Sequence, residues 1–110
     1  MIDNLIQKLT EKKNVPAFFM GDFNMNQNDE SVKYIQNKYL DTRRNAQMVY
    51  GPDFTWEDFK FNVKGTEILD YIFYKKNAKV TCKSFNTIDD FYDFKYPSDH
   101  LPILAKFLIQ

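Results

Sequence analysis

The stretch Tyr96-Pro97-Ser98-Asp99-His100-Leu101-Pro102-Ile103 decides how this sequence folds. It places the single histidine of the chain directly after an aspartate, at the entrance to the apolar run 101–109. That run alternates weakly and is rich in Leu, Ile and Phe, which predicts a mostly buried strand. Pro102 is tolerated there because it stands at the start of the strand. Polar residues at the mouth of a buried strand are typical of an active-site edge.

Two earlier stretches also join an apolar run to acidic or amide side chains. Residues 16–20 are apolar and lead into Gly21-Asp22-Phe23-Asn24, and so short and uniform a run predicts a central strand. Residues 67–74 predict another strand, whose apolar sequence is interrupted by Asp70. A carboxylate in an apolar strand is costly without a partner, and the natural candidate is His100. We therefore expect the three stretches to converge on one site.

The rest of the chain predicts the elements that cover and complete this sheet. Apolar residues recur with helical spacing over 2–9, which predicts a covering helix. A polar run at 27–30 offers caps for a short helix marked by apolar positions from 32 to 39. After a turn, residues 78–88 alternate as an antiparallel strand would. The predicted fold class is α/β (α+β), a mainly antiparallel sheet with two helices on one face.

Several polar and aromatic residues leave two interpretations open. Asp22 and Asn24, taken alone, fit an ordinary turn whose side chains cap backbone N–H groups. The adjacent Arg43 and Arg44 can face solvent or meet a substrate phosphate, and solvated surface is favoured. Trp56 can stack on a substrate base or sugar, or it can belong to the core.

Composition excludes some classes of protein. A chain of 110 residues makes one domain at most. Its eleven Phe and seven Tyr give more aromatic surface than a small domain easily hides from water. Lys+Arg and Asp+Glu balance at 15 each, so nothing in the composition suggests the basic surface of a protein that holds long nucleic acid, and a nucleic-acid partner is unsupported but not excluded. One cysteine permits no disulfide framework, no apolar run is long enough to span a membrane, and the localisation stays open.

Three motifs in order resemble the last three of the endonuclease/exonuclease/phosphatase superfamily. They are Gly21-Asp22-Phe23-Asn24, Leu69-Asp70-Tyr71-Ile72-Phe73 and Ser98-Asp99-His100-Leu101-Pro102. The domain of that family is usually more than twice as long as this chain. The resemblance therefore implies that residues 1–110 are the C-terminal half of such a domain, which is half of a four-layer DNase I-like α/β sandwich.

The resemblance also implies an activity and a role for each motif residue. The activity is divalent-metal-dependent hydrolysis of phosphodiester or phosphomonoester bonds. The residue matching Asp22 orients or deprotonates the attacking water, and the one matching Asn24 hydrogen-bonds the phosphate or the nucleophile. The matches of Asp70 and His100 form a pair that donates to a phosphoryl oxygen. The match of Asp99 helps to hold the metal environment.

The same resemblance sets expectations for cofactors and partners. Oxygen ligands without Cys or a second His favour Mg²⁺ or Mn²⁺ over Zn²⁺. The substrate class stays open among nucleic acid, nucleotide, sugar phosphate and lipid phosphate. The main metal-binding Glu of the family belongs to a missing N-terminal half, so we expect the chain alone to be weak or inactive and to self-associate as a dimer through a bare apolar sheet face. The alternative function is a catalytically silent binding or interaction module that retains the half-site.

Overall fold

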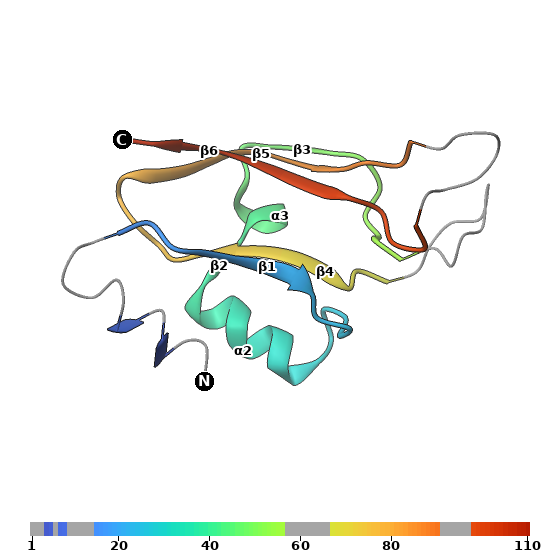
Figure 1. Ribbon diagram of the computed structural model, residues 1–110, viewed down its shortest axis with the longest axis horizontal. Coiled ribbons are helices and arrows are strands. Elements are labelled where there is room, and N and C mark those ends of the chain that lie inside the picture. The colour runs from blue at the N-terminus through green and yellow to red at the C-terminus, as the bar shows by residue number, and fades with distance from the viewer. Residues whose placement is uncertain (1–3, 6, 9–14, 57–66, 91–97) are drawn as a thin grey trace.

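Two three-stranded sheets lie face to face in the computed structural model, with a helix outside one of them (Figure 1). The structure describes residues 4–5, 7–8, 15–56, 67–90 and 98–110. The first sheet has the strand order β1-β4-β2 and the second the order β3-β5-β6. The strands are β1 (Phe18–Asp22), β2 (Leu40–Asp41), β3 (Met48–Tyr50), β4 (Asp70–Tyr74), β5 (Val80–Thr87) and β6 (Ile103–Ile109). The helices are α2 (Glu30–Lys38) and the short α3 (Thr42–Asn45).

The first sheet is antiparallel and is built around β4. Both β1 and β2 pair with β4, and the register sets Asp22 opposite Asp70. This register places two carboxylates next to each other at the same end of the sheet. In the second sheet β5 is central, because it pairs with β6 in the antiparallel direction and with β3 in the parallel direction.

Helix α2 covers the outer face of the first sheet. Asp29 starts this helix by accepting a hydrogen bond from the Ser31 N–H at 2.8 Å. Alternate residues of β4, Tyr71 and Phe73, are buried in one cluster with Val32 of the helix. Because successive side chains of a strand point to opposite faces, the other residues of β4 face the second sheet. The remaining members of the cluster and the residues packed against it are Tyr39, Ala17, Phe19, Phe23, Met25, Ile35 and Ile68.

Aromatic contacts and one arginine join the two sheets. The ring of Phe107 on β6 meets Phe18 of β1 at 4.7 Å and Tyr74 of β4 at 5.2 Å between centroids, both edge to face. Arg43 of α3 donates to the Thr87 hydroxyl on β5 at 3.0 Å, and its guanidinium lies over the ring of a β5 phenylalanine. The favoured interpretation of this arginine as solvated surface is therefore wrong, whereas its neighbour Arg44 is exposed.

The predicted fold class is confirmed, but the expectation of a single sheet is wrong. Among the described strands pairing is mainly antiparallel, and only β3 and β5 run parallel. The chain crosses to the other sheet after β4, so the strand predicted over 78–88 pairs with β3 and β6 and not with β4. The run 16–20, predicted as a central strand, forms β1 at the edge of the described sheet. The central place belongs to β4, which is covered on both faces.

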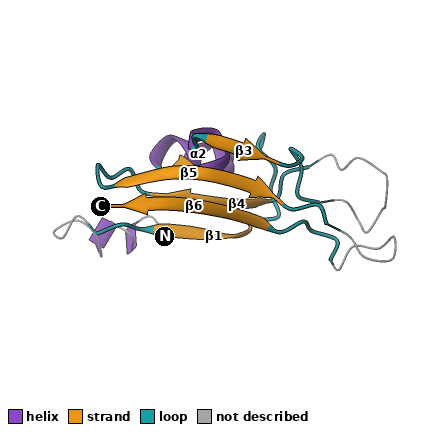
Figure 2. Ribbon diagram, turned by 90° about the horizontal axis from the view of Figure 1, so that it is seen from above, coloured by secondary structure: helices purple, strands orange, loops and turns teal. Residues whose placement is uncertain are grey.

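Strand β6 is less buried than the sequence predicts. Its residues alternate, and Leu104 and Leu108 are each 46% exposed on the face away from the first sheet. No described helix lies over that outer face, as Figures 1 and 2 show. Half of the helix predicted over 2–9 lies outside the described residues, and the described positions 4, 5, 7 and 8 are helical. No helix among the parts of the chain described here is long and apolar enough to cross a membrane.

Candidate active site

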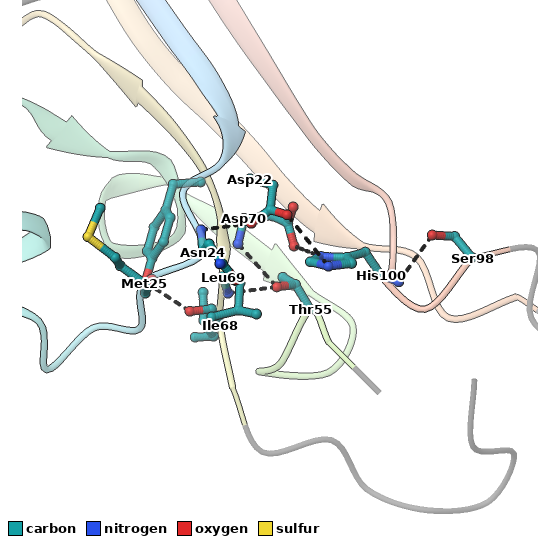
Figure 3. A network of polar contacts seen from close by, with 10 residues as sticks. Asp22, Asn24, Met25, Thr55, Ile68, Leu69, Asp70, Ser98 and His100 are labelled. Atoms are coloured by element: carbon teal, nitrogen blue, oxygen red, sulfur yellow. Dashed lines mark hydrogen bonds and ion pairs between the residues drawn. The ribbon is translucent and has the colours of Figure 1, made fainter. Parts of the chain in front are cut away.

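A line of three polar side chains, Asp70, His100 and Asp22, occupies one end of the first sheet (Figure 3). Nδ1 of His100 lies 2.7 Å from Oδ2 of Asp70, so the predicted contact between these two residues is present. Nε2 of the same ring lies 3.6 Å from Oδ2 of Asp22, too far for a hydrogen bond. The imidazole is thus held at one nitrogen, while the other faces a carboxylate across a short gap.

A buried threonine fixes the strand that carries Asp70. The Thr55 hydroxyl accepts hydrogen bonds from the N–H groups of Leu69 at 2.9 Å and Asp70 at 3.2 Å. The Thr55 carbonyl accepts one from the N–H of Leu101, the residue after His100. Asp70 is therefore the first residue of β4 rather than an interior one, with its side chain at the mouth of the strand. Sequence reasoning missed Thr55, although a hydroxyl between two aromatic residues was a signal of a buried polar contact.

The turn after β1 holds Asp22 and Asn24. Asn24 has a positive φ of 53°, and its N–H donates to Oδ1 of Asp22 at 2.8 Å. The capping turn left open by the sequence therefore exists, but it uses only one carboxylate oxygen, since Oδ2 faces His100. The side chain of Asp22 is 48% exposed and Asn24 is exposed, so both can reach a bound molecule.

The two remaining predicted site residues lie beside His100. Trp56 is half-buried, and its backbone forms isolated bridges with Glu67 and His100. Asp99 is also half-buried and precedes His100, but it is not part of the group of ligand atoms, from Asp22, Asp70 and His100, that lie within 4.8 Å of one another. The roles of Trp56 in stacking and of Asp99 in metal binding stay predictions.

Surrounding carboxylates favour the charged form of the imidazole. The hydrogen bond to Asp70 is the main cause that raises the pKa of His100 above its ordinary value of 6.5. The negative charges of Asp70, Asp22 and Asp99 raise it further, while burial opposes them. Because the pKa is raised by folding, this interaction stabilises the protein fully below the unfolded pKa of 6.5 and is lost as pH rises through the higher folded pKa.

The ligand atoms of this cluster are of the type that a hard divalent cation prefers, but few of them are free to bind one. Carboxylate oxygens are the ligands that Mg²⁺ and Mn²⁺ prefer. Asp70 and His100, however, already use their facing atoms on each other, and Oδ1 of Asp22 accepts from the N–H of Asn24, so Asp22 offers its Oδ2. Mg²⁺ is usually held by one or two carboxylates together with several waters, and one carboxylate of this group already binds the imidazole.

The chain is similar in sequence to known proteins. The family model described as "Endonuclease/Exonuclease/phosphatase family" matches residues 1–100. Nocturnin of Rattus norvegicus is 28% identical over 120 residues, which cover 97% of this chain and 28% of the relative. The chain thus spans less than a third of the curated relatives it matches.

Solved structures resemble the fold over nearly the whole chain. A mannosyl-6-phosphatase from Bacteroides thetaiotaomicron superposes with a TM-score of 0.87 at 23% identity, covering 98% of this chain and 43% of that one. An endonuclease/exonuclease/phosphatase from Bacteroides vulgatus gives a TM-score of 0.79 at 27% identity, covering 97% and 42%. The fold is therefore DNase I-like, and this chain spans about two fifths of those structures.

The single histidine allows a direct test of the electrostatics. Replacing Asp70→Asn should lower the pKa of His100 toward 6.5, because the strongest partner of the charged imidazole is lost. Asp22→Asn should lower it less, and Asp99→Asn least. NMR titration of the one histidine ring in metal-free buffer measures all three values. An unchanged pKa in Asp70→Asn would show that the contact does not form in solution.

The buried hydroxyl of Thr55 makes a second prediction. Thr55→Val keeps the shape but leaves two N–H groups without an acceptor, so it should lower the free energy of unfolding by about 2–4 kcal/mol. Thr55→Ser keeps the hydroxyl and serves as the matched control, with a smaller loss from one deleted methyl. Urea unfolding followed by circular dichroism compares them. Equal stability of the valine and serine variants would mean that the hydroxyl does not hold β4.

Proposed function

We propose, since this chain belongs to the endonuclease/exonuclease/phosphatase family, that it forms the C-terminal half of a divalent-metal-dependent phosphoesterase domain. The domain would hydrolyse phosphodiester or phosphomonoester bonds. One observation carries the proposal: Nε2 of His100 and Oδ2 of Asp22 face each other across 3.6 Å, while Asp70 holds the far nitrogen of the ring. An acid donor and a base acceptor are thus placed side by side.

His100 acts on the phosphate in this proposal. Asp70 accepts from Nδ1 and favours the protonated ring, so Nε2 carries a proton that it can donate to a phosphoryl oxygen. A fixed donor aimed at developing negative charge lowers the barrier, because it needs no rearrangement during the reaction. Asp70 is therefore a positioning residue, and His100 is the group that contacts the substrate.

Asp22 and Asn24 act on the attacking water and the phosphate. The exposed Oδ2 of Asp22 accepts a proton from water as the water oxygen bonds to phosphorus. The ester bond from phosphorus to the leaving oxygen breaks, and the leaving oxygen takes a proton from solvent, which yields a phosphate and an alcohol. Asp22 then releases its proton to solvent. The amide of Asn24 hydrogen-bonds the phosphate from the same turn, and Trp56 stacks on the base or sugar of the substrate.

Mg²⁺ or Mn²⁺ completes the proposed site. When bound, such an ion supplies positive charge against the phosphate. Asp99 is the proposed ligand from this chain, and further oxygen ligands come from residues outside the described set. Because the set seen here is incomplete, the isolated chain could also serve as a catalytically silent binding module that retains the half-site.

The uncovered apolar surfaces support a proposed place where another half of the domain would dock. Leu104 and Leu108 are exposed on the outer face of the second sheet. In the first sheet, Met20 on β1 is 63% exposed. The sheet edges β1 and β6 lie on the same side of the molecule, as Figure 2 shows. The solved relatives are more than twice as long as this chain, so we propose that an N-terminal half covers these surfaces. Without it, a second copy of the chain takes its place.

Turnover of phosphate esters tests the proposed function. The isolated chain should hydrolyse p-nitrophenyl phosphate and bis(p-nitrophenyl) phosphate weakly or not at all, and should bind Mg²⁺ poorly, because too few ligands are present. The longest reading frame that contains residues 1–110 should hydrolyse at least one of them. Asp22→Ala and His100→Ala should each lower its kcat by about 100-fold or more.

The matched control is Asp89→Asn, which changes an exposed carboxylate in the segment after β5. Its kcat should equal that of the unchanged protein. If the longer protein hydrolyses neither ester with Mg²⁺ or Mn²⁺, the phosphoesterase proposal is wrong. Tight, stoichiometric Mg²⁺ binding by the isolated chain, measured by calorimetry, would instead show that its site is complete.

Self-association tests the proposed docking surface. The isolated chain should elute as a dimer or larger species at tens of micromolar, since burying apolar surface yields about 25 cal/mol per Å². Leu104→Lys combined with Leu108→Lys should shift it toward monomer, because both side chains lie on the uncovered face. Tyr34→Lys, at an exposed position of α2, is the control and should leave the association unchanged. Light scattering after gel filtration decides, and a clean monomer of the unchanged chain would contradict the proposal.

A further inference from the structure

Two adjoining hollows lie next to the turn that carries Asn24. One has a volume of about 370 Å³ and is lined by Asn24, Met25, Asn26, Asn28, Asp29, Glu67 and Leu69. The other has a volume of about 320 Å³ and is lined by Asn26, Gln27, Asn28, Arg43, Asp53, Glu67 and Ile68. Because they share Asn26, Asn28 and Glu67, they form one groove with these residues in its middle, which we call the amide groove.

The amide groove is built on fixed backbone. Glu67 accepts the N–H groups of Thr55 at 2.9 Å and Trp56 at 3.2 Å with its carbonyl, so its side chain projects from an anchored segment. On the other side, the Tyr71 hydroxyl lies 3.0 Å from the carbonyl oxygen of Met25 and 2.9 Å from that of Ile68. The groove is therefore preorganised, which reduces the entropy lost when a ligand binds.

The middle of the groove offers both donors and acceptors for hydrogen bonds. Asn26 Nδ2 donates to Oε1 of Glu67 over a long 3.3 Å, and its own Oδ1 accepts from the Asn28 N–H at 2.9 Å. This pair leaves the second oxygen of Glu67 and the second N–H of the Asn26 amide for a ligand. Side-chain amides and a carboxylate at adjacent positions can bind vicinal hydroxyl groups, since each hydroxyl both donates and accepts.

The charge of the groove argues against a second phosphate. Its lining includes three carboxylates, Asp29, Asp53 and Glu67, against one guanidinium, Arg43. That guanidinium is already engaged, because its nitrogens donate to the carbonyl of Pro52 and to a buried threonine hydroxyl. A nucleic-acid backbone or a diphosphate would meet net negative charge here, whereas a neutral group would not.

The shape of the lining argues against a base or an acyl chain. Trp56 lines neither hollow, and no aromatic side chain is among their described lining residues, so a base held inside the groove itself would find no stacking surface. Apolar residues are limited to Met25, Ile68 and Leu69. A compact ring that carries several hydroxyls matches this surface better than a flat base or a hydrocarbon tail does.

The groove also adjoins the proposed reaction centre. Asn24 lines one hollow, and its N–H donates to the carboxylate of Asp22. Figure 3 shows Asn24 and Met25 on the side of Asp22 away from Ser98. Resting on the proposed function, we propose that the amide groove binds the sugar ring of a sugar-phosphate monoester, with Asn26 and Glu67 as the specificity-determining residues. The phosphate then lies between Asn24 and His100.

Binding of matched ligands to the chain itself tests this subsite. NMR titration should show that glucose 6-phosphate binds at least about tenfold more tightly than cyclohexylmethyl phosphate, whose ring has the same size but no hydroxyls. AMP should bind no better than the cyclohexyl ester. Glu67→Ala should remove the preference for the sugar, while Glu30→Ala on exposed α2 should keep it.

A second variant shows whether a loss of preference in Glu67→Ala comes from the missing carboxylate or from misfolding. Glu67→Gln keeps an acceptor for Asn26 and should lose part of the preference, with an amide spectrum that shows an intact fold. If inorganic phosphate shifts the His100 signals but all three esters bind alike, the sugar subsite is wrong and the proposed function stands. If glucose 6-phosphate shifts Asn26 and Glu67 but no phosphate compound affects His100, the groove binds sugars and the phosphoesterase proposal is wrong. If Glu67→Ala prefers glucose 6-phosphate over the cyclohexyl ester as strongly as the unchanged protein does, the role assigned to Glu67 is wrong.

Discussion

The buried Thr55 joins the two parts of the chain that the site needs. Its hydroxyl fixes the entry of β4 and its carbonyl fixes the residue after His100, so that Asp70 and His100 meet although 30 positions separate them in the sequence. The same segment anchors Glu67 through the N–H groups of Thr55 and Trp56. A polar group this buried is stable only when its partners are present, which couples the geometry of the site to the fold.

Much of the site was predictable from local patterns. An acid inside an apolar run needs a partner, and the only imidazole of the chain supplies it, so the contact of Asp70 with His100 followed from electrostatics. The division of the strands between two sheets did not follow, because alternation indicates a strand but not its neighbour. Thr55 and the amide groove were missed for the same reason, since each depends on segments that pair far apart in sequence.

The arrangement separates two tasks within a small volume. In the proposed function, the line of Asp22, His100 and Asp70 provides proton transfer and a charged donor, whereas the amide groove provides hydrogen bonds from an amide and a carboxylate on the other side of Asn24. Net negative charge in the groove would keep a second phosphate away from it, and the protonated imidazole would attract the phosphate to the centre. Charge would thus help to orient a sugar phosphate, and the hydrogen bonds of Asn26 and Glu67 would select the sugar.

The central claim is that the cluster at the end of β1 and β4 directs water onto phosphorus. The most direct test is hydrolysis of a phosphate monoester in ¹⁸O-labelled water by the longest protein that contains this chain, followed by mass spectrometry of both products. The account predicts one labelled oxygen in each phosphate released, none in the alcohol, and loss of the reaction in Asp22→Asn. Label in the alcohol, or the same rate in Asp22→Asn, would contradict it.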